Sequence, residues 1–286
     1  MLKRIITAAV ALAVFIVVLL LPPIVFTGAL AGVIIMMLYE CYTATKADTA
    51  MKVVGFISAV LLMAGGSIVF THDLSSRGRT VVIGAVMIVI LIYMALVIKE
   101  HGKRNYKDVL SSGFLTLYVV ISMGCVWYMK ESYGTPFMLL TFICAWSCDT
   151  FAYFSGRFFG KHKLIPHVSP KKTVEGSIGG VIGAALACAV YVSIVNKTAF
   201  TFNGMLTYTF AIVYGIIGGA LSQIGDLTAS AIKRDGDIKD FGWIFPGHGG
   251  FMDRFDSVMY IAPVLQILFV ISYVAGQPYT FGFMGM

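Results

Sequence analysis

Charged and glycine residues gather in one stretch of the chain, from Asp226 to Asp256. The sequence has 286 residues, of which 58% are hydrophobic and only 12% are charged, whereas soluble domains carry about 25% charged residues. Six of the 14 acidic residues nevertheless lie inside this stretch. Carboxylates, cations and paired glycines gathered at one place in an apolar chain indicate a site that handles charged groups, such as metal ions and phosphates.

The first part of this stretch can present three functional groups on one helical face. Asp226, Ser230 and Lys233 have the spacing i, i+4 and i+7, so a continuing helix would align a carboxylate, a hydroxyl and an ammonium group. Carboxylates bind hard cations such as Mg²⁺, which also take phosphate oxygens, and Lys and Arg neutralise phosphate charge. The alternative is a solvated helix end, which explains less well an acid at the edge of a glycine-rich apolar helix.

The second part runs Pro246-Gly-His248-Gly249-Gly250 and then reaches Asp253 and Asp256. Glycines let backbone N–H groups approach an anion closely, and the N-terminus of a helix favours bound phosphate. The two acids are spaced i, i+3, which predicts that they lie on one side of the following helix. A lone histidine is usually structural, but within this cluster we interpret His248 as a substrate contact rather than a general base.

Two more groups of polar residues are candidates on weaker grounds. Asp149 lies near the end of an apolar run, where it serves the site, extends to water at the membrane surface or pairs with Arg157. The order Ser169-Pro-Lys-Lys172-Thr173 could form a phosphate cradle from hydroxyl and ammonium groups. The alternative for this segment is an ordinary basic loop beside a membrane.

The elements that must position these residues are apolar helices. A membrane span needs roughly 20 apolar residues. Nine runs approach this length, near 5–21, 24–39, 53–70, 80–98, 109–129, 136–155, 177–195, 205–225 and 257–275. They predict an all-α, polytopic integral membrane protein with about nine transmembrane helices. The second run is short, and it is either tilted or forms a hairpin with the first across Pro22-Pro23. The first run also resembles a signal peptide, but its length and the eight later runs favour an uncleaved helix.

The distribution of Lys and Arg predicts the orientation. With nine spans, 17 of the 21 basic residues fall on the side of the N-terminus, which the positive-inside rule makes cytoplasmic. The N-terminus and the stretch 226–256 are therefore both predicted to be cytoplasmic. The net charge of +7 follows from this topology and also suits contact with anionic membrane lipids. We expect no nucleic-acid binding, because no basic soluble domain exists to carry it.

The polar residues divide the chain into two regions. Residues 1–130 show no polar residues that suggest chemistry and are interpreted as a transmembrane scaffold that faces lipid or a second copy. Residues 131–286 form the predicted catalytic region, with two long cytoplasmic connections at 156–176 and 226–256. Small residues repeat at i, i+4 in this region, as in Gly176/Gly180 and Gly215/Gly219, which predicts close helix packing rather than a phosphate loop.

From Ser230 to Asp256 the sequence resembles the signature of the phosphatidate cytidylyltransferases. That signature is S-x-hydrophobic-K-R-x4-K-D-x-small-x2-hydrophobic-P-x-H-G-G-hydrophobic-x-D-R-hydrophobic-D, and the chain matches it at every position. The upstream segment Ser169–Gly176 and the surroundings of Asp149 are also similar to the family, so the resemblance covers roughly 140–275.

The resemblance implies that CTP and phosphatidic acid react to give CDP-diacylglycerol and pyrophosphate, with Mg²⁺ and room for a second cation. It implies that Asp226 and Asp253 bind the metal, that Asp256 is a further ligand or supports one, and that the enzyme is membrane-embedded and dimeric. The expected catalytic residues are Asp226, Asp253, Lys233 and Asp256. The expected substrate-binding residues are Lys172, Thr173, Ser230, Arg234, Lys239, His248, Gly249, Gly250 and Arg254.

Two alternatives of different kinds stay open at this stage. A transporter or channel would have polar residues at mid-bilayer on several spans, whereas here the spans are polar mainly at their predicted cytoplasmic ends. Another membrane enzyme that uses CTP, such as a polyprenol or phytol kinase, would share the charged site and differ in its acceptor.

Overall fold

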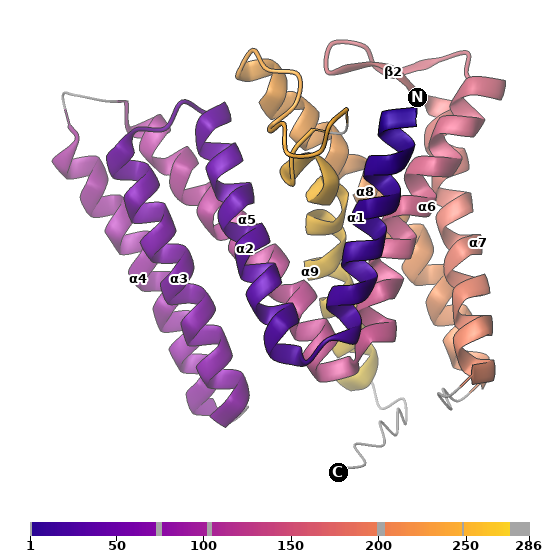
Figure 1. Cartoon of the computed structure of the whole chain (residues 1–286), viewed down its shortest axis with the longest axis horizontal. Coiled ribbons are helices and arrows are strands. Elements are labelled where there is room, and N and C mark those ends of the chain that lie inside the picture. The colour runs from indigo at the N-terminus through magenta and orange to yellow at the C-terminus, as the bar shows by residue number, and fades with distance from the viewer. Residues whose placement is uncertain (1, 73–75, 102–104, 199–203, 248, 275–286) are drawn as a thin grey trace. The chain divides into compact units, whose positions relative to one another are not determined.

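Helices make up most of the protein in the computed structural model, which describes residues 2–72, 76–101, 105–198, 204–247 and 249–274. Over these residues the chain forms nine α-helices and one two-stranded sheet (Figure 1). The elements in chain order are α1 (Leu2–Leu20), α2 (Pro23–Ala44), α3 (Thr49–His72), α4 (Ser76–Lys99), α5 (Tyr106–Tyr133), α6 (Thr135–Phe159), β1 (Lys163–Ile165), β2 (Ser169–Thr173), α7 (Val174–Thr198), α8 (Gly204–Asp235) and α9 (Met252–Val274).

Seven of the described helices are long and apolar enough to cross a membrane, namely α2 to α8. Their outer faces are apolar too, as on α4, where Ile83, Leu91 and Ile98 are more than 60% exposed. Large aliphatic side chains in such numbers on helix exteriors suit hydrocarbon rather than water. The prediction of an all-α membrane protein is therefore confirmed in its class, while the full count of nine spans stays a prediction.

Most helices extend beyond their apolar runs, and the extensions of α2 and α8 each include an acid that bears on the site. The run predicted for 24–39 stops before Glu40, but α2 continues to Ala44 and so includes this acid. The run predicted for 205–225 stops before Asp226, but α8 continues to Asp235. An apolar run ends at the first charged residue. The helix continues past that residue because its backbone hydrogen bonds do not depend on side-chain polarity.

The chain divides into two compact units, of which the first contains residues 1–127 and 231–255. Within it α1 and α2 run in opposite directions, which agrees with a hairpin across Pro22-Pro23 (Figure 1). Buried hydroxyls join three helices of this unit, since Thr116 on α5 lies 2.5 Å from the Tyr42 hydroxyl on α2 and 2.8 Å from the Tyr93 hydroxyl on α4. Buried polar groups need such partners, so this cluster fixes how the helices of the unit pack.

The second unit contains residues 128–230 and 256–286, and glycines set its helix packing. A Cβ atom added to Gly180 on α7 would lie 3.0 Å from the Cys148 carbonyl oxygen on α6. A Cβ atom on Gly215 of α8 would lie 2.5 Å from the Cα of Ala185 on α7. The helices approach this closely because hydrogen replaces a side chain there. The predicted packing role of these glycines is confirmed.

The connection at 156–176 is not an irregular loop. It folds into an antiparallel hairpin in which Lys163 pairs with Thr173 and Ile165 with Ser169. The hairpin leads directly into α7, because Thr173 ends β2 and its hydroxyl accepts a hydrogen bond of 3.1 Å from the Gly176 N–H. A threonine in this position is a favourable N-cap for the helix that follows.

Candidate functional site

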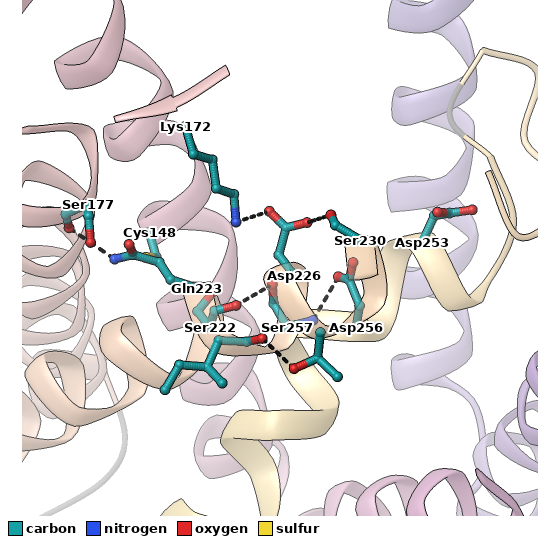
Figure 2. Close-up of polar contacts among 12 residues, drawn as sticks. Cys148, Lys172, Ser177, Ser222, Gln223, Asp226, Ser230, Asp253, Asp256 and Ser257 are labelled. Carbon is teal, nitrogen blue, oxygen red and sulfur yellow. Dashed lines mark hydrogen bonds and ion pairs between the residues drawn. The ribbon is translucent and has the colours of Figure 1, made fainter. Parts of the chain in front are cut away.

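In the second unit, Asp226 lies between a lysine and a hydroxyl. Its Oδ2 atom is 2.6 Å from the Lys172 ammonium group, and its Oδ1 atom accepts a hydrogen bond of 3.4 Å from the Ser230 hydroxyl. Figure 2 shows Lys172 reaching from the hairpin strand toward the carboxylate, with Ser230 on its other side. Two of the three groups predicted to line one helical face, Asp226 and Ser230, are therefore in contact, while the ammonium group of the third, Lys233, pairs with Asp253. The carboxylate stays about one-third exposed, so a ligand could reach it.

The start of α7 holds the hairpin that carries Lys172. The carboxylate of Glu175 accepts hydrogen bonds from the backbone N–H groups of Lys161 and His162, and it lies 2.6 Å from the His162 imidazole nitrogen. A carboxylate in the first turn of a helix also interacts favourably with the helix dipole. Glu175 and the Thr173 cap thus fix both ends of the hairpin and limit where Lys172 can point.

Helices α8 and α9 cross closely beside Asp226. A Cβ atom on Gly225 would lie 2.6 Å from the Asp256 carbonyl oxygen, so only glycine fits at this crossing. The hydroxyl of Ser257 donates to the Ser222 carbonyl oxygen at 3.1 Å, and the Asp256 carboxylate accepts the Ser257 N–H at 2.7 Å (Figure 2). Asp256 is 8% exposed, which indicates a structural or supporting position.

In the first unit, Asp253 is held on both of its oxygens. Its Oδ1 atom is 2.7 Å from the Lys233 ammonium group, and its Oδ2 atom accepts N–H hydrogen bonds from Phe241 at 2.8 Å and from Gly250 at 3.0 Å. The Asp253 side chain is only 3% exposed. The ammonium group of Lys233 also lies over the Phe241 ring, 5.5 Å from its centroid, in a cation–π arrangement.

A helix-ending motif directs the chain away from α8 after Lys233. The Ile238 N–H donates to the Lys233 carbonyl oxygen at 2.9 Å, and the Asp237 N–H donates to the Arg234 carbonyl oxygen at 3.2 Å. Asp237 has φ 56°, so these bonds form a Schellman motif with an aspartate in the left-handed position. Gly236 lies against α2, because a Cβ atom there would be 2.8 Å from the Ala44 carbonyl oxygen.

The glycine-rich loop before α9 makes a tight turn. Gly247 and Gly249 have φ values of 78° and 81°, which side chains disfavour, and the Phe245 N–H bonds to the Gly249 carbonyl oxygen at 2.9 Å. This turn brings the Gly250 N–H to Asp253. Among the described glycines of the loop, backbone geometry therefore supports Asp253. His248 lies outside the described residues.

The remaining predicted cations lie at the protein surface. Arg234 and Lys239 line an open pocket of about 300 Å³ together with Asp237 and Ile238. Arg254 is exposed on the first turn of α9. Asp149 is exposed on α6, and Arg157 on the same helix donates to the Tyr153 hydroxyl at 2.9 Å.

One residue that the sequence analysis missed is Glu40 on α2. It is 3% exposed, and it accepts the backbone N–H groups of Phe251 and Met252 at the start of α9. The argument that singled out Asp226, an acid at the end of an apolar run, applies equally to Glu40 and could have found it. A partner 211 residues away in the sequence could not have been predicted from local spacing.

The donor atoms suit a metal that arrives with a phosphate ligand. Over the described residues no group of three or more His, Cys, Asp or Glu side chains is arranged to hold a metal ion by itself. Mg²⁺ in proteins commonly binds one or two carboxylates and completes its shell with water and substrate phosphates. Asp226 and Asp253 can each supply a carboxylate oxygen once the neighbouring lysine turns to a phosphate.

Comparison with known proteins decides the family. A model of the Cytidylyltransferase family matches residues 2–272, which is nearly the whole chain. The chain belongs to this family. The resemblance drawn from Ser230–Asp256 is therefore confirmed, and it extends over the N-terminal helices that the signature does not cover.

Individual members of the cytidylyltransferase family are similar over most of their length. A phosphatidate cytidylyltransferase of Staphylococcus saprophyticus is 33% identical over 273 residues, covering 93% of this chain and 98% of the relative. One of Staphylococcus aureus is 31% identical over 269 residues, with the same coverage of 93% and 98%. One of Bacillus subtilis is 40% identical over 162 residues, covering 54% of this chain and 57% of the relative.

Proposed function

We propose that this protein transfers CMP from CTP to phosphatidic acid, giving CDP-diacylglycerol and pyrophosphate. The observation that carries the proposal is the pairing of each key carboxylate with a lysine, Asp226 with Lys172 and Asp253 with Lys233. Such pairs can open to give a carboxylate for a cation and an ammonium group for a phosphate. Membership of the cytidylyltransferase family, with relatives named phosphatidate cytidylyltransferase, supports the choice of substrates.

The nucleophile in this reaction is a phosphate oxygen of phosphatidic acid. A phosphomonoester has a second pKa of about 6, so this oxygen is largely ionised at neutral pH and needs no strong general base. It forms a bond to the α-phosphorus of CTP, and the bond from that phosphorus to the bridging oxygen of the β-phosphate breaks. Pyrophosphate leaves with the electron pair. The problem for the protein is to bring two anions together in line.

The chain supplies cations for this task. Under the proposal, Lys172 and Lys233 turn from their carboxylates to phosphate oxygens, and Arg234, Lys239 and Arg254 bind further phosphate charge. Ser230, Thr173 and the backbone of Gly249, with His248, complete the substrate contacts, whereas Gly250 serves the site through its N–H bond to Asp253. Asp226 and Asp253 hold Mg²⁺, with Asp256 in support, and a second cation fits the same scheme. When bound, Mg²⁺ would neutralise phosphate charge and stabilise the leaving pyrophosphate.

The proposal includes the membrane topology. One substrate is a lipid with an anionic head and the other is a water-soluble nucleotide, so the reaction belongs at a membrane surface. The excess of Lys and Arg on one predicted side supports a cytoplasmic N-terminus and a cytoplasmic stretch 226–256. Nine spans, and the division into a scaffold of residues 1–130 and a catalytic region of residues 131–286, remain part of this proposal.

The experiment is a pyrophosphate-release assay on the purified full chain in lipid nanodiscs. Pyrophosphate should appear only when CTP, phosphatidic acid and Mg²⁺ are all present, and ATP should not replace CTP. Release of CDP or ADP with a polyprenol or phytol acceptor would instead identify a lipid kinase. Flux of a lipid or ion without nucleotide turnover would support a transporter and contradict the proposal.

A further inference from the structure

A buried carboxylate in the first unit has no part in the proposed chemistry. Glu40 lies in the last turns of α2, between residues of an apolar helix, and is 3% exposed. Removing a carboxylate from water is strongly unfavourable unless hydrogen bonds or counter-charges replace the lost hydration. An acid kept in such a place therefore has partners that matter, and the structure shows which they are.

The partners of Glu40 are backbone N–H groups at the start of α9. Its Oε1 atom accepts the Phe251 N–H at 3.0 Å, and its Oε2 atom accepts the Met252 N–H at 2.8 Å. Because α9 begins at Met252, these donors have no partner inside the helix. The negative charge also lies at the positive end of the helix dipole. One side chain of α2 thus caps a helix that begins more than 200 residues later.

Two glycines make room for this carboxylate. A Cβ atom added to Gly242 or to Gly250 would overlap the Oε1 atom of Glu40. Both glycines belong to the loop that runs from α8 to α9, Gly242 in its middle and Gly250 near its end. The two glycines lie beside each other, since a Cβ atom on Gly242 would also be 3.0 Å from the Gly250 Cα. A side chain at either position would push the acid away from the N–H groups that it binds.

We propose that Glu40 is a positioning residue for Asp253. Met252 directly precedes Asp253 in the chain, and the Gly250 N–H donates to the Asp253 carboxylate at 3.0 Å. Glu40 binds the N–H groups on both sides of Phe251. It thereby fixes the backbone segment that carries Asp253 and the Gly250 N–H group that orients the Asp253 carboxylate. Glu40 itself touches no substrate in this scheme. The inference rests on the proposed function, in which Asp253 binds Mg²⁺.

The first test is Glu40→Gln in the purified full chain. Glutamine has the same shape but only one acceptor oxygen, so its NH₂ group would face one of the two N–H donors. We expect the Mg²⁺ concentration for half-maximal pyrophosphate release to rise roughly 10- to 100-fold, the range typical for residues that orient a metal ligand. A loss of folded protein alone would lower the rate and leave this concentration unchanged.

A second readout needs no turnover. Without nucleotide or metal, hydrogen–deuterium exchange should become faster at the amides of 250–253 in Glu40→Gln, while exchange in α4 and α5 stays as in the wild type. Glu100→Gln is the matched control, because Glu100 lies in the same unit just after α4 and is partly exposed. That variant should change neither the exchange at 250–253 nor the Mg²⁺ dependence.

Gly242→Ala tests the same inference with Glu40 intact. The added methyl group should displace the carboxylate and shift the Mg²⁺ dependence in the same direction. The double variant should show less than the combined effect of both changes, because the two act on one contact. If Glu40→Gln does not fold, Gly242→Ala decides alone: wild-type Mg²⁺ dependence in a folded Gly242→Ala protein would overturn the inference.

Failure of the inference and failure of the proposed function look different. Wild-type protein without CTP- and phosphatidate-dependent pyrophosphate release contradicts the proposed function. Wild-type turnover together with unchanged Mg²⁺ dependence and unchanged exchange in Glu40→Gln contradicts only the role given to Glu40.

Discussion

At the scale of single residues, the two key carboxylates differ in how firmly they are held. Asp253 is 3% exposed and contacts one ammonium group and two backbone N–H groups. Asp226 is 33% exposed and contacts one ammonium group and one hydroxyl. A carboxylate with partners on both oxygens keeps its orientation when a ligand binds, whereas a partly exposed carboxylate can rotate toward the ligand. We therefore expect their variants to fail in different ways.

Asp253→Asn should abolish turnover. The amide removes the charge that faces Lys233 and weakens any bond to Mg²⁺, so we expect pyrophosphate release to fall by roughly 100-fold or more, the equivalent of several kcal/mol of lost charge stabilisation. Asp235→Asn is the control, because Asp235 is exposed, lies in the same unit and falls at an unspecified position of the signature. Full activity of a folded Asp253→Asn protein would remove Asp253 from the proposed site.

Lys172→Gln should weaken catalysis without harming the fold. The Lys172–Asp226 pair is partly exposed, so its loss should change the free energy of unfolding by only about 0–1 kcal/mol. A lost charge-assisted contact to phosphate should reduce kcat/KM for CTP about tenfold or more. The neighbouring Lys171 is exposed, and Lys171→Gln should behave as the wild type. Equal kinetics in the two variants would contradict a phosphate-binding role for Lys172.

At the scale of elements, glycine determines which helices can meet beside the site. The crossing of α8 and α9 at Gly225 leaves no room for a methyl group, since the added carbon would lie 2.6 Å from the Asp256 carbonyl oxygen and 3.1 Å from the Cα of Ser257. Because Asp226 is the next residue along α8, the crossing also sets the place of that carboxylate. Under the proposed function, packing and chemistry therefore depend on the same few residues.

Gly225→Ala should be destabilising. Forcing a methyl group into this contact should lower the free energy of unfolding by roughly 1–3 kcal/mol, measured by thermal or denaturant unfolding in detergent micelles. Gly124→Ala is the control, because a Cβ atom on Gly124 meets nothing within 4 Å. In that variant alanine should be neutral or stabilise α5 by up to about 1 kcal/mol. Similar destabilisation by both variants would show that the effect does not come from the α8–α9 contact.

The elements that the sequence predicts well are those that a bilayer constrains. Each apolar run forms a helix, because in lipid the backbone N–H and C=O groups can hydrogen-bond only to one another. The hairpin at 163–173 was not predicted, because its strands are short and its residues are typical of a basic loop beside a membrane. The capping of α9 by Glu40 escaped because it joins distant segments, and no local periodicity encodes such a contact.

At the scale of the whole molecule, topology remains the testable consequence of the charge distribution. The proposed topology places Lys239 on the side with excess positive charge and Lys197 on the opposite side. Lys239→Cys should react with a membrane-impermeant maleimide in inside-out vesicles, and Lys197→Cys only in right-side-out vesicles. The wild type, whose five cysteines are buried or partly buried, serves as the labelling control. The reverse pattern would place the stretch 226–256 outside the cell and contradict the proposal.

The lysine–carboxylate pairs also bear on how a catalytic cycle ends. Lys172 and Lys233 each have an internal anion within 2.7 Å. Under the proposed function each lysine–carboxylate pair exchanges anions: phosphate displaces the carboxylate when substrate binds, and the carboxylate displaces phosphate when product leaves. Each carboxylate is tethered beside its lysine and so competes with phosphate at a high local concentration. Pyrophosphate is no longer held through the cytidine, so it should be the ligand most easily replaced. The contacts of Lys172 with Asp226 and of Lys233 with Asp253 would then limit product inhibition.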